Sequence, residues 1–256
     1  MSKEISKTAL ITGASSGIGR ETAVKLAGEG YNVSITARNN TELEVTRKRI
    51  SENENKCLIL PLDLSIEENI EQCINKTIDT FSRLDVLVNA AGIIGSGSVE
   101  TTELSDWDYM MDINLRSVFY LMSCAVLHLK KTKGTIINVS SVTGLRAFPN
   151  ILSYCVSKAG VDQLTRCAAL ELAPDSIRVN AINPGVMVTN LHKRSGMDEK
   201  KYKEFLEHST STHPLGRVGK PEEAAELIAF LASEKAGWIT GTTISIDGGR
   251  AQTCAR

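Results

Sequence analysis

Residues 8–19 read TALITGASSGIG, and this stretch decides the fold class. Its first four residues form a short apolar run of the kind that makes a buried β-strand. Gly13, Gly17 and Gly19 follow, and the turn opens directly into a stretch with helical spacing. Glycines let the backbone come close to a phosphate, and a helix N-terminus offers unpaired N–H groups with partial positive charge. The turn therefore predicts an anion site suited to a pyrophosphate, with a plain turn as the alternative.

The alternation of strand and helix continues along the chain. Seven short apolar runs predict buried strands, and six stretches with helical spacing lie between them. Such alternation indicates a parallel sheet with helices on both faces. No linker of biased composition and no internal repeat interrupts it, so we predict an α/β protein built as a single doubly wound Rossmann domain over residues 1–256. The predicted strands are Thr8–Ile11, Val33–Thr36, Cys57–Leu60, Val86–Val88, Thr135–Val139, Val179–Ile182 and Thr242–Ile246, and the predicted helices are Ile18–Gly28, Thr41–Ser51, Glu67–Phe81, Trp107–Leu129, Tyr154–Leu172 and Glu222–Leu231.

The stretch Met187–Arg217 departs from this alternation. We expect it to be irregular apart from one amphipathic piece, Glu199–His208. Long insertions after a strand commonly serve as binding lids, so this stretch is the predicted substrate loop. It holds His192, His208 and His213, whose spacing matches no metal-ligand pattern. We therefore expect these histidines on the surface and no metal site.

Composition and charge exclude several classes of function. Acidic and basic residues nearly cancel to a formal net charge of -1, so no nucleic acid partner is expected. The one dense basic cluster, Lys130, Lys131 and Lys133, follows a helical pattern and is explained by a solvated helix end. Six scattered cysteines fit free thiols, and we expect neither a signal peptide nor a segment of membrane-spanning length. The expectation is a cytoplasmic protein without membrane contact.

Four motifs together resemble those of the short-chain dehydrogenase/reductase family. The glycine-rich turn has three residues between its first two glycines, and the other motifs follow in the family's order and separation. The resemblance extends from Lys7 to Gly249 and implies a nicotinamide cofactor and hydride exchange with a small-molecule carbonyl or alcohol substrate. One departure is Ala90, where the family often has a second asparagine, and the family tolerates this change. The motifs are Thr12-Gly13-x-x-x-Gly17-Ile18-Gly19, Asn89-Ala90-Ala91-Gly92, Tyr154-x-x-x-Lys158 and Asn183-Pro184-Gly185.

The end of the second predicted strand bears on the choice of cofactor. In a Rossmann domain this point meets the adenosine ribose, where an acidic residue would repel a 2′-phosphate. Ala37 stands here and Arg38 follows it. A hydrogen bond to a charged group contributes about 1.5–3 kcal/mol, so Arg38 favours NADP(H) over NAD(H) by about one to two decades. The alternative is a solvated arginine at a strand end.

Further cofactor contacts follow from the resemblance. Asp63 and Leu64, expected at the end of the third strand, correspond to the family's adenine contact, although Asp63 has the alternative of capping the next helix. The segment after the sixth strand corresponds to the one that holds the nicotinamide carboxamide, although a Pro-Gly pair is otherwise a turn. The predicted cofactor-binding residues are Gly13, Ser15, Ser16, Gly17, Ile18, Gly19, Arg38, Asp63, Leu64, Asn89, Ala90, Gly92, Tyr154, Lys158, Pro184, Gly185, Met187 and Thr189.

Tyr154 and Lys158 form the predicted catalytic pair. They are four residues apart in a predicted helix, so their side chains share one face. A nearby ammonium favours a phenolate, and we expect Lys158 to lower the pKa of Tyr154 below its ordinary value of about 10. Tyr154 could then serve as the general acid in reduction and as the general base in oxidation.

Two more residues complete the predicted catalytic set. Ser141, expected at the end of the fifth strand, could hydrogen-bond the substrate oxygen, and in an extended strand only one of Ser140 and Ser141 can face the site. By family spacing Ser141 is the catalytic serine, and Asn114 matches the asparagine that holds a water linking the lysine to solvent. The resemblance thus implies the tetrad Asn114, Ser141, Tyr154 and Lys158, each of which alone would have a structural explanation. A serine hydrolase is excluded because neither a nucleophile elbow nor a placed histidine accompanies Ser141.

The substrate is less constrained than the chemistry. Apolar residues in the substrate loop and in Val142–Pro149 predict a mainly apolar pocket for a steroid-, retinoid-, dicarbonyl- or 3-oxoacyl-like substrate. The overall pattern resembles 3-oxoacyl carrier-protein reductases, but Thr132 and Asp175 align with the two arginines that dock the carrier there, which disfavours a carrier-bound substrate. The candidate pocket residues are Leu145, Phe148, Ile151, Met187, Leu191 and Met197.

The resemblance also implies a homotetramer. The helices Trp107–Leu129 and Tyr154–Leu172 would form one interface, and Glu222–Leu231 with the last strand would form another. Two other functions remain open, an NAD-dependent alcohol dehydrogenase of the same fold and a non-catalytic nucleotide-binding regulator. Arg38 disfavours the first, and the complete tetrad disfavours the second.

Overall fold

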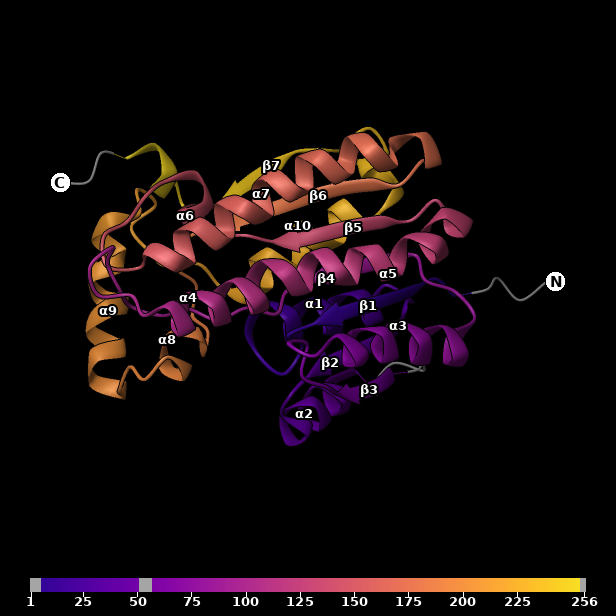
Figure 1. Cartoon of the computed structure of the whole chain (residues 1–256), viewed down its shortest axis with the longest axis horizontal. Helices are drawn as coiled ribbons and strands as arrows, with labels where there is room; N and C mark the ends of the chain where they lie inside the picture. Colours follow the sequence, from indigo (N-terminus) through magenta and orange to yellow (C-terminus); the bar gives the residue numbers. More distant parts are fainter. Residues whose placement is uncertain (1–5, 51–56, 254–256) are drawn as a thin grey trace.

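The protein folds around one parallel β-sheet (Figure 1). The computed structural model describes residues 6–50 and 57–253. Within them the seven strands lie in the order β3-β2-β1-β4-β5-β6-β7 and all pairs are parallel, so the predicted fold class is confirmed. The chain reverses its direction of winding between β1 and β4, the point at which such sheets bind ligands. The strands are β1 (Thr8–Thr12), β2 (Asn32–Ala37), β3 (Cys57–Pro61), β4 (Val86–Asn89), β5 (Thr135–Val139), β6 (Arg178–Pro184) and β7 (Thr243–Ile246).

Helices cover both faces of the sheet (Figure 1). Successive residues of a strand point to opposite faces, so Ile11 and its neighbour Leu10 lie in separate apolar clusters. Burial on both sides explains why the strands read as continuous apolar runs. All six predicted helices exist, although Ser51, one predicted end, lies outside the described residues. The first face carries α1 (Gly17–Gly28), α2 (Asn40–Ile50) and α10 (Pro221–Ala232), and the second carries α3 (Glu67–Phe81), α5 (Ser117–Thr132) and α7 (Leu152–Leu172).

The predicted helix Trp107–Leu129 is longer than expected. α4 (Leu104–Met111), the π-helical turn η1 (Asp112–Arg116) and α5 form one continuous run, Leu104–Thr132. This run of 29 residues is long and apolar enough to cross a membrane, and in the described part of the chain it is the single such helix. The expectation that no segment reaches this length was therefore wrong. The run packs against α3, α7 and the sheet, as the core helix of a globular protein does.

The stretch after β6 is helical rather than irregular. α8 (Leu191–Arg194) and α9 (Glu199–Thr212) lie beyond the carboxyl ends of the strands (Figure 1). α9 begins where the Asp198 carboxylate accepts a hydrogen bond of 2.8 Å from the Lys201 N–H, and it runs four residues past the predicted end at His208. The remaining short elements are α6 (Val142–Leu145), η2 (Ala173–Asp175), η3 (Glu234–Ala236) and η4 (Arg250–Gln252).

Candidate active site

The glycine-rich turn after β1 is locked against the end of β4. The Thr12 hydroxyl accepts hydrogen bonds of 3.0 Å from the N–H groups of both Ala90 and Ala91. Gly13 has φ +66°, and a Cβ there would lie 2.7 Å from the Ala90 oxygen. A Cβ on Gly19 would lie 2.5 Å from the Gly13 oxygen. Only glycine fits at either position, so the motif is required by close backbone packing as well as by any ligand.

The N-terminus of α1 is open to an anion. Ser16 is its N-cap residue, yet the Ser16 side chain makes no capping hydrogen bond, and the first turn of α1 holds no acidic residue. Ser15 is buried, and Ile18 packs against the apolar cluster beneath the turn. Gly17 has φ +54° and begins the helix. The uncapped N–H groups and the helix dipole fit the pyrophosphate of a dinucleotide.

The predicted cofactor residues that follow β2 and β3 have different surroundings. Arg38 is exposed directly beyond β2, and its Nη1 donates a hydrogen bond of 3.1 Å to the Tyr109 hydroxyl. Asp63 and Leu64 were expected at the end of β3, but this strand ends at Pro61. The Asp63 carboxylate accepts from the N–H of Ser65 at 3.0 Å and from its hydroxyl at 2.9 Å.

The helix-cap interpretation of Asp63 is wrong, and its contact with an adenine stays a prediction. The N-cap of α3 is Ile66, so Asp63 stabilises a local turn and does not cap the helix. The Leu64 side chain is packed in the apolar core on the α3 side of the sheet. Any contact of Leu64 with an adenine would therefore come from its backbone.

Tyr154 and Lys158 share one face of α7, as their spacing predicts. The Lys158 Nζ lies 5.8 Å from the centre of the Tyr154 ring and donates a hydrogen bond of 2.9 Å to the Val139 carbonyl at the end of β5. Both side chains are buried. The Ser141 hydroxyl lies near the Tyr154 phenol, where it favours the phenolate. The structure therefore brings the three polar groups together beside the end of β5.

The pKa of Tyr154 differs from the expected one. Burial raises the pKa of Tyr154 to about 12, and the nearby Ser141 hydroxyl opposes this only in part. Burial lowers the pKa of Lys158 to about 8, and the charge of Asp162 opposes it. The expectation that Lys158 lowers the pKa of Tyr154 is wrong for the protein groups alone, because desolvation outweighs a lysine that points toward Val139. At neutral pH Tyr154 retains its proton.

Ser141 lies beyond the strand rather than in it. β5 ends at Val139, and Ser141 is the N-cap of α6, where its Oγ accepts a hydrogen bond of 3.1 Å from the Thr143 N–H. The neighbouring Ser140 turns the other way, and its hydroxyl donates to the Lys158 carbonyl at 3.1 Å. Ser141 and not Ser140 therefore faces the Tyr154 phenol, although the cause is a helix cap and not strand alternation.

Asn114 joins the segment after β4 to α7. It lies in the π-helical turn η1, fully buried, and its amide forms two hydrogen bonds of 2.9 Å with the backbone of Ile93. Its Nδ2 also donates to the Ser157 hydroxyl at 3.1 Å. A Cβ placed on Gly92 would lie 3.3 Å from the Asn114 Oδ1 and 3.5 Å from the Lys158 Nζ. Asn114 and Lys158 thus flank the same glycine.

A buried carboxylate beneath the site was not found from the sequence. Asp162 lies one turn beyond Lys158 and is 1% exposed. Both its oxygens accept from the Asn183 amide, at 3.1 and 2.9 Å, and this amide also donates to the Ser141 carbonyl at 2.9 Å. Burial raises the pKa of Asp162, and the nearby Ser140 hydroxyl and the Asn183 amide oppose it. The network fixes the serine segment to β6.

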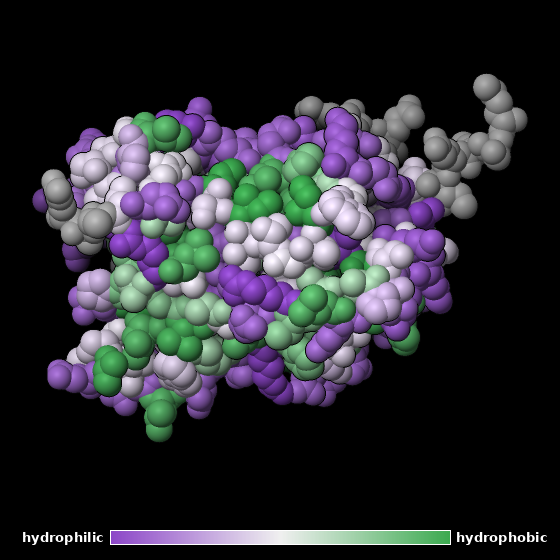
Figure 2. All heavy atoms as spheres, turned by 90° about the horizontal axis from the view of Figure 1, so that it is seen from above, coloured by the Kyte–Doolittle hydropathy of each residue, from purple (hydrophilic) through white to green (hydrophobic). Residues whose placement is uncertain are grey.

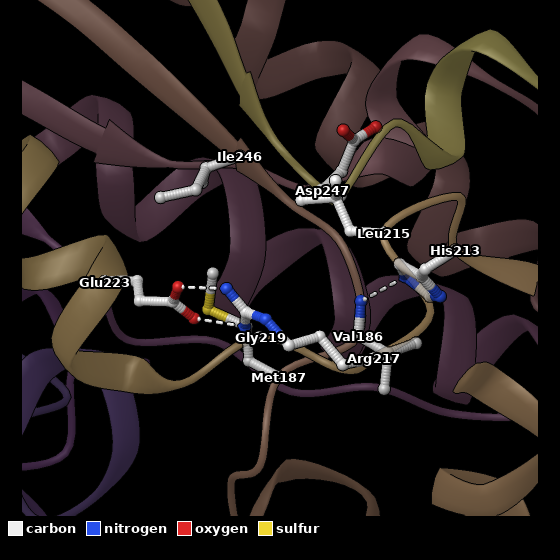
Figure 3. Close-up of a pocket in the computed structure, with 10 residues that line it drawn as sticks. Val186, Met187, His213, Leu215, Arg217, Gly219, Glu223, Ile246 and Asp247 are labelled. Carbon is white, nitrogen blue, oxygen red and sulfur yellow. Dashed lines mark hydrogen bonds and ion pairs between the residues drawn. The ribbon is translucent and has the colours of Figure 1, made fainter.

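The segment after β6 is held by a histidine (Figure 3). His213 was expected on the surface but is 3% exposed, because its ring is bonded on both sides. The Nε2 accepts from the Val186 N–H at 3.1 Å, and the Nδ1 lies 2.7 Å from the Ser209 carbonyl in α9. A Cβ on Gly185 would lie 2.8 Å from the Nε2. Thr189 is held in turn by the Tyr202 hydroxyl, which donates to its carbonyl at 2.8 Å.

Some predicted site residues are not gathered in the cleft. The Asn89 amide is buried and donates to the Asn138 Oδ1 at 2.9 Å, so it joins β4 to β5. Of the six candidate pocket residues, only Met187 lines the cavity of about 100 Å³ in Figure 3, and its side chain is also part of the core under α10. Leu145 is 39% exposed, and the Arg250 guanidinium covers the Phe148 ring at 5.3 Å. Among the described residues no cluster of histidine, cysteine and acidic side chains could hold a metal.

Comparisons with known proteins agree over nearly the whole chain. A family model described as enoyl-(acyl carrier protein) reductase matches residues 13–251. The chain is 38% identical over 244 residues to 3-oxoacyl-(acyl-carrier-protein) reductase FabG of Thermotoga maritima, which covers 95% of this chain and 97% of that protein. It is also 38% identical over 248 residues to the enzyme of the same name from Staphylococcus aureus, covering 96% of this chain and 98% of that one.

Two solved structures share the fold over nearly the whole chain. A short-chain dehydrogenase/reductase of unknown function from Caenorhabditis elegans, solved with cofactor, has a TM-score of 0.92 at 36% identity, covering 98% of this chain and 97% of that one. Carveol dehydrogenase from Mycobacterium avium, in complex with NAD, has a TM-score of 0.91 at 26% identity, covering 96% and 98%.

Proposed function

Because the chain belongs to the short-chain dehydrogenase/reductase family of oxidoreductases, we propose that it interconverts a ketone or aldehyde with the corresponding alcohol, using NADP(H). The observation that carries this proposal is the meeting of Tyr154, Ser141 and Lys158 at the end of β5, beside the turn with the open N-terminus of α1. A nicotinamide, when bound, supplies or accepts the hydride.

The protein's own groups handle the proton. In reduction, Ser141 donates a hydrogen bond to the substrate oxygen, and Tyr154 donates its phenolic proton to the same atom. The high pKa of Tyr154 keeps this proton available at neutral pH. The charged Lys158 stabilises the phenolate that remains, and Asn114 holds the segment after β4 against this lysine. Tyr154 is therefore in the protonated form that reduction requires.

Arg38 is the residue that we assign to the choice of NADP(H). No carboxylate stands at the end of β2, and the exposed guanidinium there, now bonded to the Tyr109 hydroxyl, could pair with a 2′-phosphate. Two relatives are named 3-oxoacyl carrier-protein reductases, whereas carveol dehydrogenase was solved with NAD. An NAD-dependent alcohol dehydrogenase is therefore the second candidate, and Arg38 is the residue that separates the two.

We assign the substrate to the mainly apolar class and expect it free rather than carrier-bound. The Thr132 hydroxyl donates to the Leu84 carbonyl at 2.7 Å, and Asp175 forms an ion pair of 2.8 Å with Lys130. Neither position offers a cation to an acidic carrier protein. We keep residues 187–217, the lid, in one domain with the rest of the chain. This lid would select among steroid-, retinoid-, dicarbonyl- and 3-oxoacyl-like substrates. A rate on a carrier-linked 3-oxoacyl substrate far above that on its small thioester analogue would overturn this assignment.

We also propose a homotetramer. Figure 2 looks onto the side that carries α7 and β7 and shows apolar patches among polar ones. Large apolar side chains are exposed on α5 and α7, which suits burial against a second copy. The exposed side chains are Phe119, Leu127, Val156 and Leu170. Sedimentation of a stable monomer at micromolar concentration would contradict the proposal.

The first experiment separates binding from turnover. NADPH and NADH are titrated into the pure protein, followed by the fluorescence of the reduced nicotinamide, and the nucleotide that binds is offered with a panel of diketones, steroids, retinoids and short 3-oxoacyl thioesters. Tighter binding of NADPH and turnover that is lost in Tyr154→Phe are expected. Tight binding without Tyr154-dependent turnover on the panel would favour a nucleotide-binding regulator, and failure to bind either nucleotide would sink the proposal.

A further inference from the structure

The first turn of the lid lies against the phosphate-binding turn. A Cβ on Gly17 would lie 3.0 Å from the Thr189 Cγ2, so the start of the lid contacts the beginning of α1. Five residues further on, the Arg194 guanidinium at the end of α8 lies 3.4 Å from the Ser15 Oγ. A cation of the lid thus stands beside the open helix N-terminus.

The lid is held in this position by its own contacts. The Tyr202 hydroxyl of α9 accepts from the Thr189 N–H at 3.2 Å and donates to the Thr189 carbonyl at 2.8 Å. The Lys193 ammonium lies over the Tyr202 ring at 4.7 Å and pairs with Glu199 at 2.7 Å. α8 is therefore fixed to α9 on one side, and Arg194 extends from it toward the turn.

The other cation at the turn, Arg20, already has partners. Arg20 donates to the Ser15 carbonyl, to the Glu42 carboxylate at 2.6 Å and to the Thr46 hydroxyl at 3.0 Å. Its charge is thus compensated by Glu42. By contrast, no carboxylate of the described residues lies within ion-pair distance of Arg194, whose guanidinium contacts the neutral Ser15 hydroxyl. Arg194 is an exposed residue, so its guanidinium is available to an anion bound at this turn.

We propose that Arg194 binds the pyrophosphate of the dinucleotide and thereby couples cofactor binding to closure of the lid. The N–H groups of α1 would contact the phosphates from below, and the guanidinium would contact them from the lid side. The inference rests on the proposed function, because it needs a dinucleotide in this cleft. It assigns to Arg194 a different part of the ligand from Arg38, which would face the 2′-phosphate.

A series of nucleotides tests the assignment by binding alone. Calorimetry on the full chain measures NADPH, NADH, ADP-ribose, which has the pyrophosphate without the nicotinamide, and AMP, which lacks the pyrophosphate. Arg194→Gln is expected to weaken the first three by about tenfold or more and to change AMP by less than about twofold, because a charge-assisted hydrogen bond is lost only with the former. Arg194→Lys should restore part of the loss. Arg38→Gln is the matched control, expected to weaken NADPH and to leave NADH and ADP-ribose unchanged.

Hydrogen exchange provides the second readout. In the wild type, ADP-ribose should slow exchange of the amides in α8 and α9, and in Arg194→Gln saturating ADP-ribose should not. Wild-type affinity of Arg194→Gln for ADP-ribose, or an equal loss for ADP-ribose and AMP, would overturn the assignment while the proposed function stands. A wild-type protein that binds none of the dinucleotides would overturn both.

Discussion

Replacing His213 with phenylalanine tests how the segment after β6 is held. The change keeps a ring of similar size but removes the acceptor for the Val186 N–H and the partner of the Ser209 carbonyl. Because a carbonyl can only accept, Nδ1 carries the proton and Nε2 is the acceptor. Leaving a part-buried donor or acceptor without a partner costs about 1–3 kcal/mol each. Partial rescue by water brings the expected loss to about 2–3 kcal/mol, which for a chain of this size lowers the melting temperature by about 4–12 °C.

The assay is thermal melting at one fixed protein concentration, since assembly would otherwise shift the midpoint. NADPH affinity is measured in parallel and should fall, because Gly185 contacts the same ring. Two controls separate the contacts: His213→Gln keeps an acceptor near the Val186 N–H, and His213→Asn keeps a donor for the Ser209 carbonyl. Each should recover part of the loss. A melting point of His213→Phe within about 1 °C of the wild type would refute the reasoning.

Three further predictions concern charge and close packing. The kcat/KM for carbonyl reduction should fall above about pH 8, because Lys158 loses its proton there. Asp162→Asn should move this fall to lower pH, because the Asp162 charge raises the pKa of Lys158. A profile that is flat to pH 10 would contradict this. Between about pH 8 and the ordinary lysine pKa of 10.5, Lys158 is protonated in the unfolded chain but not in the folded one. The free energy of unfolding should therefore increase as the pH rises through this range. Denaturant titrations of Lys158→Met should lack this increase. Gly19→Ala would place a Cβ 2.5 Å from the Gly13 oxygen, so we expect a lower melting temperature and NADPH binding weakened at least tenfold, and wild-type values in both measurements would show that the turn can relax.

Local patterns determined the frame of the molecule. Seven apolar runs predict the seven strands of the sheet, because a strand buried on both faces must be apolar throughout. The glycine spacing locates the anion-binding turn. The backbone packs so closely at Gly13 and Gly19 that a residue with a side chain does not fit at either position. The spacing of Tyr154 and Lys158 places both on one face of α7, because helical geometry follows from sequence separation alone.

The sequence could not give the electrostatics of the site. The pKa of Tyr154 is set by how deeply α7 is buried and by the turn of Lys158 toward Val139, and both depend on the packing of α7 against β5. The same holds for Asp162, whose neighbours are Ser140, just after β5, and Asn183, in β6. Ser141 likewise faces Tyr154 because the chain leaves β5 early and begins α6.

The lid shows the limit most clearly. From the sequence it reads as an irregular stretch with surface histidines, yet α8 and α9 bring Arg194 to Ser15 and bury His213 against Val186. Each of these contacts joins residues that are far apart in the chain, so no local sequence pattern predicts it. Sequence alone determined the periodic elements and the motifs within them, because neighbours along the chain fix their geometry. Only the tertiary structure decided which charges and ring nitrogens meet, because these pairs depend on how the helices dock on the sheet.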